Sequence, residues 1–305
     1  MNIVEQLRKQ DLESFFKPEF PALFRKTNRP NSRRGLEPYS GPWNQVAVMH
    51  LLNRSLFGYR KADLQSFLQG NLADALSQLL EYSSAASEPV NDYHGYIDYL
   101  NTLPEYQGQN TIEETVAPGE SWVDENRQPN NAGVALTSAR IASLKAWWLK
   151  NILNQENTLE EKMLFFWHNI LVTQSFGVFA PAFTYQYIET LRQYGTGNFR
   201  ELIRHITKDG AMLLYLNGYL NTRFGPDENY ARELQELFTV GKGPDSRYTE
   251  SDVSEAARVL TGWTINYETY EVFFVPQNHD PGEKQFSEFY GNKTISGGNT
   301  QQDAE

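Results

Sequence analysis

Residues 225–263 read GPDENYARELQELFTVGKGPDSRYTESDVSEAARVLTGW, and this stretch predicts two helices joined by a turn of Gly and Pro residues. Pro226 suits the first position of the first helix, because the proline ring holds φ near the helical value. Thr249 and Asp252 have the spacing of a capping box, which predicts the start of the second helix. We therefore expect the surrounding fold to be helical.

The first of these helices places charged and amide side chains beside its apolar stripe. At about 100° per residue the polar arc spans about 100°. It contains Asn229, Arg232, Glu233 and Glu236, and the adjoining apolar arc contains Tyr230, Leu234, Leu237 and Phe238. Carboxylates so close to a core-facing stripe are either solvated at its margin or paired in a polar pocket, with Arg258 of the second helix as a candidate partner. The sequence leaves a structural ion network and an active site equally open.

Helical periodicity extends on the N-terminal side of this stretch. Apolar residues recur at i, i+3 and i+4 in segments 43–57, 60–69, 72–82, 91–101, 136–155, 159–174, 182–194, 199–208 and 212–216. On the C-terminal side, residues 264–276 are rich in β-branched and aromatic residues, which predicts one or two strands. An extended piece at 286–295 is a candidate to pair with them. The sequence predicts a mainly α fold: a multi-helix globular domain with a small β-hairpin or short antiparallel sheet near the C-terminal end.

Three regions are expected along the chain. Residues 1–42 combine an N-terminal helix with a basic Pro/Arg-rich arm, which either lies over an acidic body or meets an anionic partner. Residues 43–298 are expected to form a single mostly helical domain with a long loop at 102–133, either functional or mobile. Residues 299–305 form a polar tail that resembles the start of a helix, so we expect the natural chain to continue.

Composition excludes several classes of protein. The net charge of −11 and the pI near 5.1 argue against a nucleic-acid partner. The absence of Cys excludes disulfides, thiolate metal sites and cysteine nucleophiles. No stretch approaches the roughly 18 apolar residues of a transmembrane segment, and the N-terminus lacks the apolar core of a signal peptide. These features predict a soluble protein and leave its compartment undecided.

The helix predicted at 159–174 is apolar on nearly every side, so we expect it near the centre of the domain. His168 and Asn169 interrupt it, and both need hydrogen-bond partners if they are buried. They are either a satisfied pair that joins helices or a functional pair in which His168 is a base, a ligand contact or a metal ligand in a cavity. Glu161 lies roughly 10 Å away along the axis, and a capping box starting at Thr158 explains it without chemistry.

A metal site is only weakly indicated. His279 and Asp280 follow the predicted strands, but Asp280 also begins an Asp-Pro-Gly turn signal, and no second cluster has ligand spacing. The chain also lacks a Walker loop, a dinucleotide-binding glycine fingerprint, a nucleophile elbow and a zinc-protease helix. The cofactor therefore stays unknown.

Six segments, taken in order, carry a family resemblance. They are HLLNRSLFGY (50–59), EKMLFFWHNILVTQ (161–174), GNFRELIRHITKDGAMLLYLNG (197–218), ENYARELQELFTVG (228–241), YTESDVSEAARVLTGW (248–263) and HDPGEKQF (279–286). Together they resemble the bacterial domain-of-unknown-function 1800 family. The resemblance implies a mostly helical domain with no established reaction, cofactor or substrate. It also implies export to the periplasm or envelope, because family members are often exported.

The family pattern falls on residues of every candidate site. These are His168, Asn169, Asn229, Arg232, Glu233, Glu236, Arg258, Trp263, His279 and Asp280. The leading hypothesis is a polar pocket for ligand binding or acid/base hydrolysis, in which Glu233 or Glu236 is the acid/base, Arg232 orients it and His168 assists. Asn169, Asn229, Arg258 and Trp263 would then bind the ligand, a small molecule or a carbohydrate.

Two other functions are compatible with the same residues. One is a non-enzymatic, envelope-associated interaction or scaffold protein whose polar residues are a structural network, and a large exposed aromatic surface would favour it. The other is a metal enzyme that uses His279, Asp280 and a carboxylate. Neither the oligomeric state nor enzymatic activity follows from the sequence.

Overall fold

The computed structural model describes residues 38–82, 86–106, 113, 116–123, 134–298 and 300–301. The chain divides into two units, Met1–Pro42 and Trp43–Glu305, and every helix and strand discussed below belongs to the second. The helix expected near the N-terminus lies outside the described residues, as does most of the loop expected at 102–133. The single domain at 43–298 and the polar tail at 299–305 stay predictions.

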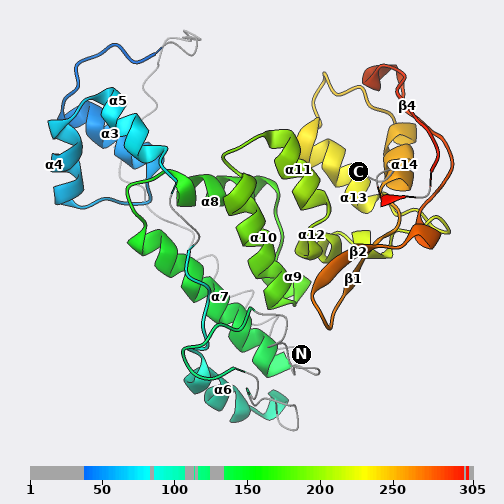
Figure 1. Ribbon diagram of the computed structural model, residues 1–305, viewed down its shortest axis with the longest axis horizontal. Coiled ribbons are helices and arrows are strands. Elements are labelled where there is room, and N and C mark those ends of the chain that lie inside the picture. The colour runs from blue at the N-terminus through cyan, green and yellow to red at the C-terminus, as the bar shows by residue number, and fades with distance from the viewer. Residues whose placement is uncertain are drawn as a thin grey trace, which may run out of the picture. The chain divides into compact units, whose positions relative to one another are not determined.

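The structure is mainly helical, and the fold-class prediction is confirmed (Figure 1). The helices are α3 (Gln45–Ser55), α4 (Lys61–Gln69), α5 (Leu72–Leu79), α6 (His94–Asn101), η2 (Pro104–Tyr106), α7 (Val134–Asn154), α8 (Glu160–Ile170), α9 (Ser175–Val178), α10 (Pro181–Tyr194), α11 (Phe199–Thr207), α12 (Gly210–Tyr215), η4 (Gly218–Leu220), α13 (Glu228–Glu233), η5 (Leu234–Thr239), α14 (Glu250–Val259), η6 (Pro276–Asn278) and η7 (Glu288–Tyr290). The strands are β1 (Trp263–Asn266), β2 (Glu271–Phe274), β3 (Lys284–Gln285) and β4 (Thr294–Ile295). Among the described residues, no helix is both long enough and apolar enough to cross a membrane.

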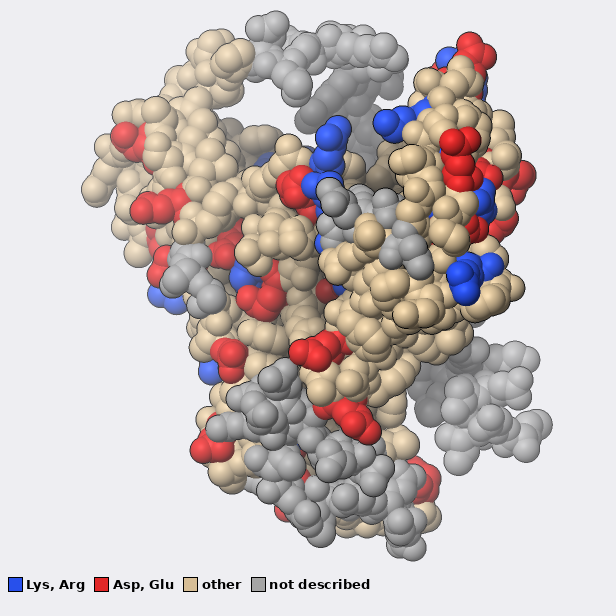
Figure 2. Space-filling model, turned by 45° about the vertical axis from the view of Figure 1, so that its right-hand side comes forward, with Lys and Arg blue, Asp and Glu red and all other residues tan. Residues whose placement is uncertain are grey.

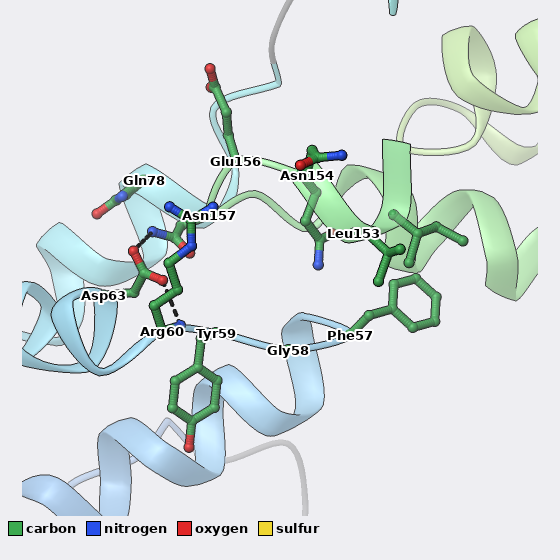
Figure 3. A pocket seen from close by; sticks show the side chains of 12 residues that line it. Phe57, Gly58, Tyr59, Arg60, Asp63, Gln78, Leu153, Asn154, Glu156 and Asn157 are labelled. Atoms are coloured by element: carbon green, nitrogen blue, oxygen red, sulfur yellow. Dashed lines mark hydrogen bonds between the residues drawn. The ribbon is translucent and has the colours of Figure 1, made fainter. Parts of the chain in front are cut away.

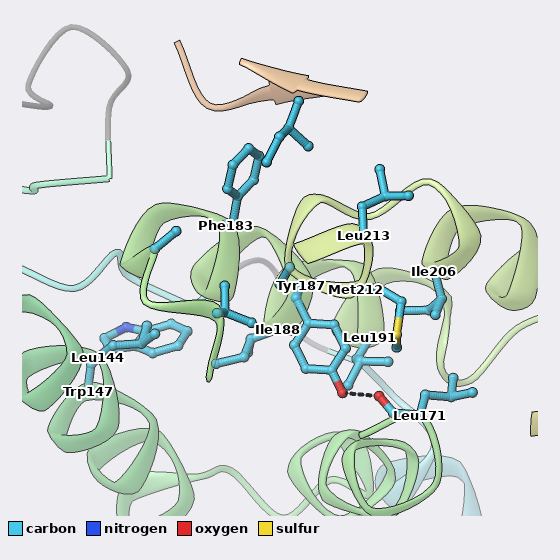
Figure 4. Packing of buried hydrophobic residues seen from close by; sticks show 14 of the residues in the cluster. Leu144, Trp147, Leu171, Phe183, Tyr187, Ile188, Leu191, Ile206, Met212 and Leu213 are labelled. Atoms are coloured by element: carbon cyan, nitrogen blue, oxygen red, sulfur yellow. Dashed lines mark hydrogen bonds between the residues drawn. The ribbon is translucent and has the colours of Figure 1, made fainter. Parts of the chain in front are cut away.

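Helix α10 organises the main hydrophobic core. Phe183, Tyr187, Ile188 and Leu191 form one buried stripe along it, at the spacing expected of a core-facing helix. Figure 4 shows this stripe between Leu144 and Trp147 of α7 and apolar residues of α11 and α12. The sequence pattern of 182–194 therefore corresponds to the central helix of the fold.

A second, smaller core joins α3, α4 and α5. Its buried members include Val48, Leu52, Phe67 and Leu79. Helix α3 begins at an Asn44 cap, whose side-chain oxygen accepts hydrogen bonds from two backbone N–H groups of the first turn. Local sequence signals thus define the boundaries of these helices well.

Helix α8 is less central than its composition predicts. Phe165 and Phe166 are 42% and 49% exposed, whereas Glu161 and Leu164 are buried against α10. The helix ends at Ile170, and a separate short helix, α9, follows it. The expectation of a centrally buried helix over 159–174 is therefore wrong, because one aromatic face of α8 lies at the surface.

The β structure consists of two separate antiparallel pairs. Strands β1 and β2 form the predicted hairpin, with Trp263 opposite Phe274. Strand β4 pairs with β3, so the expectation that the segment at 286–295 pairs with the hairpin is wrong. Gly262 leads from α14 into β1 with a φ of 98°, a conformation that glycine adopts readily.

The helix expected to begin at Pro226 begins two residues later. Asp227 is its N-cap and accepts a hydrogen bond from the backbone N–H of Asn229. From Leu234 the chain continues as a π-helical turn, η5, in which the N–H of Val240 bonds to the C=O of Gln235. The π turn changes the angular spacing of side chains, so a uniform 100° per residue does not hold across this segment. The capping box at Thr249 and Asp252 is confirmed.

Candidate functional site

Arg232 and Glu236 belong to an ion-pair network at the surface. The Arg232 guanidinium lies 2.7 Å from Glu250, 3.0 Å from Glu228 and 3.8 Å from Glu236, and Glu236 lies 3.0 Å from Lys242. The Glu250 and Lys242 side chains are 79% and 75% exposed, so water screens these pairs. Lys242 lowers the pKa of Glu236. In this solvated network the Glu236 carboxylate is ionised and already paired with Arg232 and Lys242.

Glu233 and Asn229 lie on the same helix but outside this network. Glu233 is half-buried, and its side chain makes no hydrogen bond or ion pair with any described residue. The exposed Asn229 amide donates to the C=O of Leu216 at 3.0 Å, which ties α13 to the end of α12. Helix α13 packs on α14, and within the described chain it does not pack closely on α8. The structure therefore does not bring Glu233 or Glu236 to His168.

Arg258 pairs with Asp280 rather than with Glu233 or Glu236. Its Nε and Nη2 atoms lie 2.8 and 3.1 Å from the two carboxylate oxygens, a bidentate geometry that lowers the pKa of Asp280. The buried His279 ring hydrogen-bonds through Nδ1 to the C=O of Thr261 at 2.8 Å. These bonds fasten the segment after β2 to the end of α14.

Metal ligation by this segment gains no support from its neighbours. Among the residues that the structure describes, no three His, Asp or Glu side chains are grouped so that they could hold a metal ion. Both Asp280 oxygens already accept from Arg258. Trp263 is buried in β1, where Phe274 packs edge-on against its ring and Lys208 lies 5.5 Å from the ring centroid. The contacts of Asp280 and Trp263 thus hold the hairpin and the segment after it against neighbouring elements.

Of the predicted catalytic residues, His168 has the most distinctive surroundings. It borders a hollow of about 230 Å³ between α7, α9 and α10. The other lining residues are Leu144, Lys145, Trp148, Thr173, Gln174, Ser175, Thr184, Tyr187 and Ile188. Asn169, its neighbour in sequence, faces away and donates to the C=O of Phe165, one turn earlier on α8. The two residues expected to act as a pair are therefore separated by the geometry of the helix.

Hydrogen bonds define which nitrogen of His168 carries the proton. The Tyr187 hydroxyl donates its only proton to the C=O of Leu171 at 2.5 Å, a bond visible in Figure 4. Burial raises the pKa of Tyr187, so this proton stays in place. The Tyr187 oxygen lies 3.1 Å from Nδ1 of His168 and must therefore accept from it. In the neutral ring Nε2 is then unprotonated, and it makes no hydrogen bond with any described residue.

The ionisation of His168 also depends on its burial. Desolvation lowers the pKa of the imidazole below its ordinary value of 6.5, so the ring is neutral at pH 7. The Thr173 hydroxyl beside it is buried and lies within reach of the Tyr187 oxygen. The hollow thus combines an oriented neutral base and the Thr173 hydroxyl with the exposed Lys145 side chain at its edge.

Glu161 and Arg192 form a buried ion pair that no sequence motif predicts. Glu161 lies 2.5 Å from Arg192 and accepts a hydrogen bond from the Trp148 indole at 3.0 Å. The capping box expected from Thr158 does not form, because Leu159 is the N-cap and has no side-chain cap. The available signal was that Glu161 shares a helical face with the buried Leu164, where a carboxylate requires a partner. The hollow beside His168 was missed for a similar reason, since Lys145 and Thr173 have no sequence motif.

Charges on the surface are mixed in sign. On the face turned toward the viewer in Figure 2, Lys and Arg side chains are interspersed with Asp and Glu. The mixture agrees with a chain in which 27 basic residues are outnumbered by 38 acidic ones.

Comparison with known proteins identifies the family but no individual relative. The family described as "Protein of unknown function (DUF1800)" matches residues 50–305. Neither the curated proteins nor the solved structures give a match. The resemblance carried by the six sequence segments is thereby confirmed. Because the match spans most of the sequence, the chain belongs to the DUF1800 family of proteins of unknown function.

Proposed function

We propose that this protein is a small-molecule hydrolase in which His168 acts as the general base. The observation that carries the proposal is the orientation of the imidazole: Tyr187 accepts from Nδ1, so that Nε2 is the basic nitrogen. A neutral base next to a cavity is the arrangement that general base catalysis requires. The volume of about 230 Å³ limits the substrate to a small molecule.

The lining residues support a hydrolytic reaction in particular. Nε2 of His168 would take a proton from water as the water oxygen attacks an ester carbonyl. The Lys145 side chain also lines this hollow. Its ammonium lies 4.4 Å from the centroid of the Phe176 ring, and it would have to turn toward the substrate to stabilise the oxyanion that develops. The imidazolium would then return the proton to the leaving alcohol, which completes the reaction without a net change in the enzyme. The catalytic role expected of Glu233 and Glu236 has no counterpart in this mechanism.

Hydrolysis of p-nitrophenyl acetate by the purified chain tests the proposal. We expect the rate to rise through the lowered pKa of His168 and to level off above its ordinary value of 6.5. His168→Gln should lower kcat/KM by about 100-fold or more. His50→Gln, on the exposed surface of α3, is the matched control and should leave the rate unchanged. Equal rates in the two variants, or no hydrolysis at all, would refute the assignment.

The tautomer can be tested without any substrate. In ¹⁵N NMR spectra recorded at a pH at which the His168 ring is neutral, Nδ1 should have the chemical shift of a protonated nitrogen and Nε2 that of an unprotonated one. Tyr187→Phe removes the acceptor and should mix the two tautomers. A neutral ring protonated at Nε2 would contradict the hydrogen-bond assignment on which the mechanism depends.

A second candidate function is a non-enzymatic interaction or scaffold protein. The observation that favours it is the aromatic surface of α8, where Phe165 and Phe166 are exposed and Phe165 packs against Phe57. Exposed aromatic groups of this kind often mark contact sites. Sedimentation velocity would show self-association that Phe165→Ser abolishes, in a protein without esterase activity. A monomer at all accessible concentrations would give this alternative no support.

A further inference from the structure

A second hollow lies where α7 ends and α8 begins. It has a volume of about 160 Å³, and Asn151, Gln155, Glu161 and Arg192 are among its lining residues. The Trp148 indole separates it from the hollow beside His168, because the indole N–H donates to Glu161 while the ring packs edge-on against His168. The proposed hydrolytic mechanism uses none of the residues that line this second hollow.

Three buried polar atoms beside this hollow have no hydrogen-bond partner in the described chain. They are Nη2 of Arg192, Nδ2 of Asn151 and Oε1 of Gln155. The Arg192 side chain is only 7% exposed. Buried polar groups are nearly always hydrogen-bonded in folded proteins, so three unpartnered atoms around one hollow indicate that a bound molecule completes them.

The charges around the hollow exclude an anionic ligand. Arg192 already lies 2.5 Å from Glu161, 3.2 Å from Glu189 and 3.6 Å from Glu160. Its positive charge is therefore more than balanced, and Glu156 adds a further carboxylate to the lining. A phosphate or carboxylate would meet net repulsion here. The unpartnered groups are two nitrogen donors and one oxygen acceptor. Neighbouring hydroxyl groups of a ligand can pair with both kinds, because each hydroxyl both donates and accepts a hydrogen bond.

A wider groove of about 630 Å³ continues from this hollow and shares Asn154, Gln155 and Glu156 with it. Figure 3 shows the Phe57 ring beside Leu153 on one side of the groove, and the amides of Gln78 and Asn157 on the other. Asp63 holds Asn157 in place at 3.0 Å. Apolar surfaces beside several amides match the alternating CH and OH groups of sugar rings.

We infer that the hollow and the groove together bind a neutral oligosaccharide. One terminal sugar places adjacent hydroxyls against Arg192, Asn151 and Gln155. The following rings extend along the groove, with their CH faces on Phe57 and Leu153 and their hydroxyls on the amides. The site is distinct from the His168 hollow, so it stands or falls independently of the hydrolase proposal.

Binding of fluorescently labelled neutral oligosaccharides of increasing length tests this inference. We expect affinity to increase from the monosaccharide to the trisaccharide, because longer chains fill the groove as well as the hollow. Asn151→Asp exchanges the unpartnered donor for an acceptor without changing the size of the side chain, and should weaken binding by about tenfold or more. Asn53→Asp makes the same charge change on the exposed surface of α3 and should change the affinity less than about twofold.

Three results would overturn the inference. The first is the absence of saturable binding across a panel of neutral glucans, mannans and chitin oligomers. The second is equal affinity in the Asn151→Asp and Asn53→Asp variants, with unchanged circular dichroism spectra showing that both are folded. The third is a preference for sulfated or uronic-acid oligosaccharides, or for a peptide, over the neutral sugars.

Discussion

Asp209 offers a sharp test of the electrostatics of the core. This carboxyl caps α12, and its Oδ1 atom accepts hydrogen bonds from the backbone N–H groups of Ala211 and Met212 at 3.0 and 3.1 Å. Burial raises its pKa from 3.8 to about 7, although these two bonds act in the opposite direction. The folded protein therefore pays a penalty for ionising Asp209 that the unfolded chain does not.

The local hydrogen bonds are compatible with a protonated carboxyl. Thr190 donates its hydroxyl proton to the C=O of Gln186 at 3.0 Å, and its oxygen lies 3.5 Å from Oδ2 of Asp209. That oxygen can accept a hydrogen bond from a neutral carboxyl, or from the amide of an Asp209→Asn variant. The substitution keeps the capping oxygen and removes only the ionisation.

The expected size follows from the difference in pKa. A tenfold change in proton affinity corresponds to ~1.4 kcal/mol, so the shift implies a loss of up to ~4 kcal/mol of stability on ionisation. The folded state binds the proton more tightly, so the free energy of unfolding falls as pH rises from about 4 to about 7 and is constant above. Asp209→Asn should therefore match the wild type near pH 4 and exceed it increasingly up to pH 7.

Urea unfolding followed by tryptophan fluorescence at a series of pH values measures this difference. Taking the difference between variant and wild type cancels the titration of all other groups that the two proteins share. A stability difference that does not depend on pH, or a variant that is less stable at neutral pH, would refute the reasoning. The first result would mean that the fold leaves the pKa of Asp209 at its unfolded value, and the second that the ionised carboxylate is stabilised by its cap interactions.

Three further substitutions test other parts of the fold by the same unfolding measurement. The Glu113 carboxylate is 0% exposed and lies 2.6 Å from the Arg140 guanidinium. Arg140→Ala removes this cation and should lower the free energy of unfolding by ~3–5 kcal/mol; a decrease below ~1 kcal/mol would contradict the buried pair. Gly262→Ala places a Cβ atom 2.8 Å from the Phe274 ring at a φ of 98°, and should cost ~1–3 kcal/mol; an unchanged stability would show that β1 relaxes. Glu236→Gln breaks a solvent-screened pair and should shift the midpoint far less than Arg140→Ala; an equal shift would mean that the surface network is structurally important.

Much of the helical architecture could be predicted because its signals are local. The caps at Asn44 and Thr249 act within one turn of their own helix. The apolar stripe of α10 likewise shows in its own residues, as does the hairpin at β1 and β2. The partner of β4 could not be predicted in this way, because a two-residue strand has no distinguishing pattern.

The position of α8 was mispredicted for a different reason. Composition shows that Phe165 and Phe166 are apolar, but their exposure depends on whether another helix covers that face. The helix that carries Arg232 and Glu236 is a comparable case. The two side chains share one side of it, 3.8 Å apart, as expected, but that side meets the exposed Glu250 and Lys242 rather than a pocket.

The sequence alone determined the helical class, the family and one residue of the candidate site, His168. Only the tertiary structure decided what surrounds that residue: Tyr187 from α10, which orients the imidazole, and Lys145 from α7. The physical reason is that helix formation depends on residues within a few positions of one another. The burial of a charge, the direction of a hydrogen bond and the shape of a hollow depend instead on residues far apart in the chain.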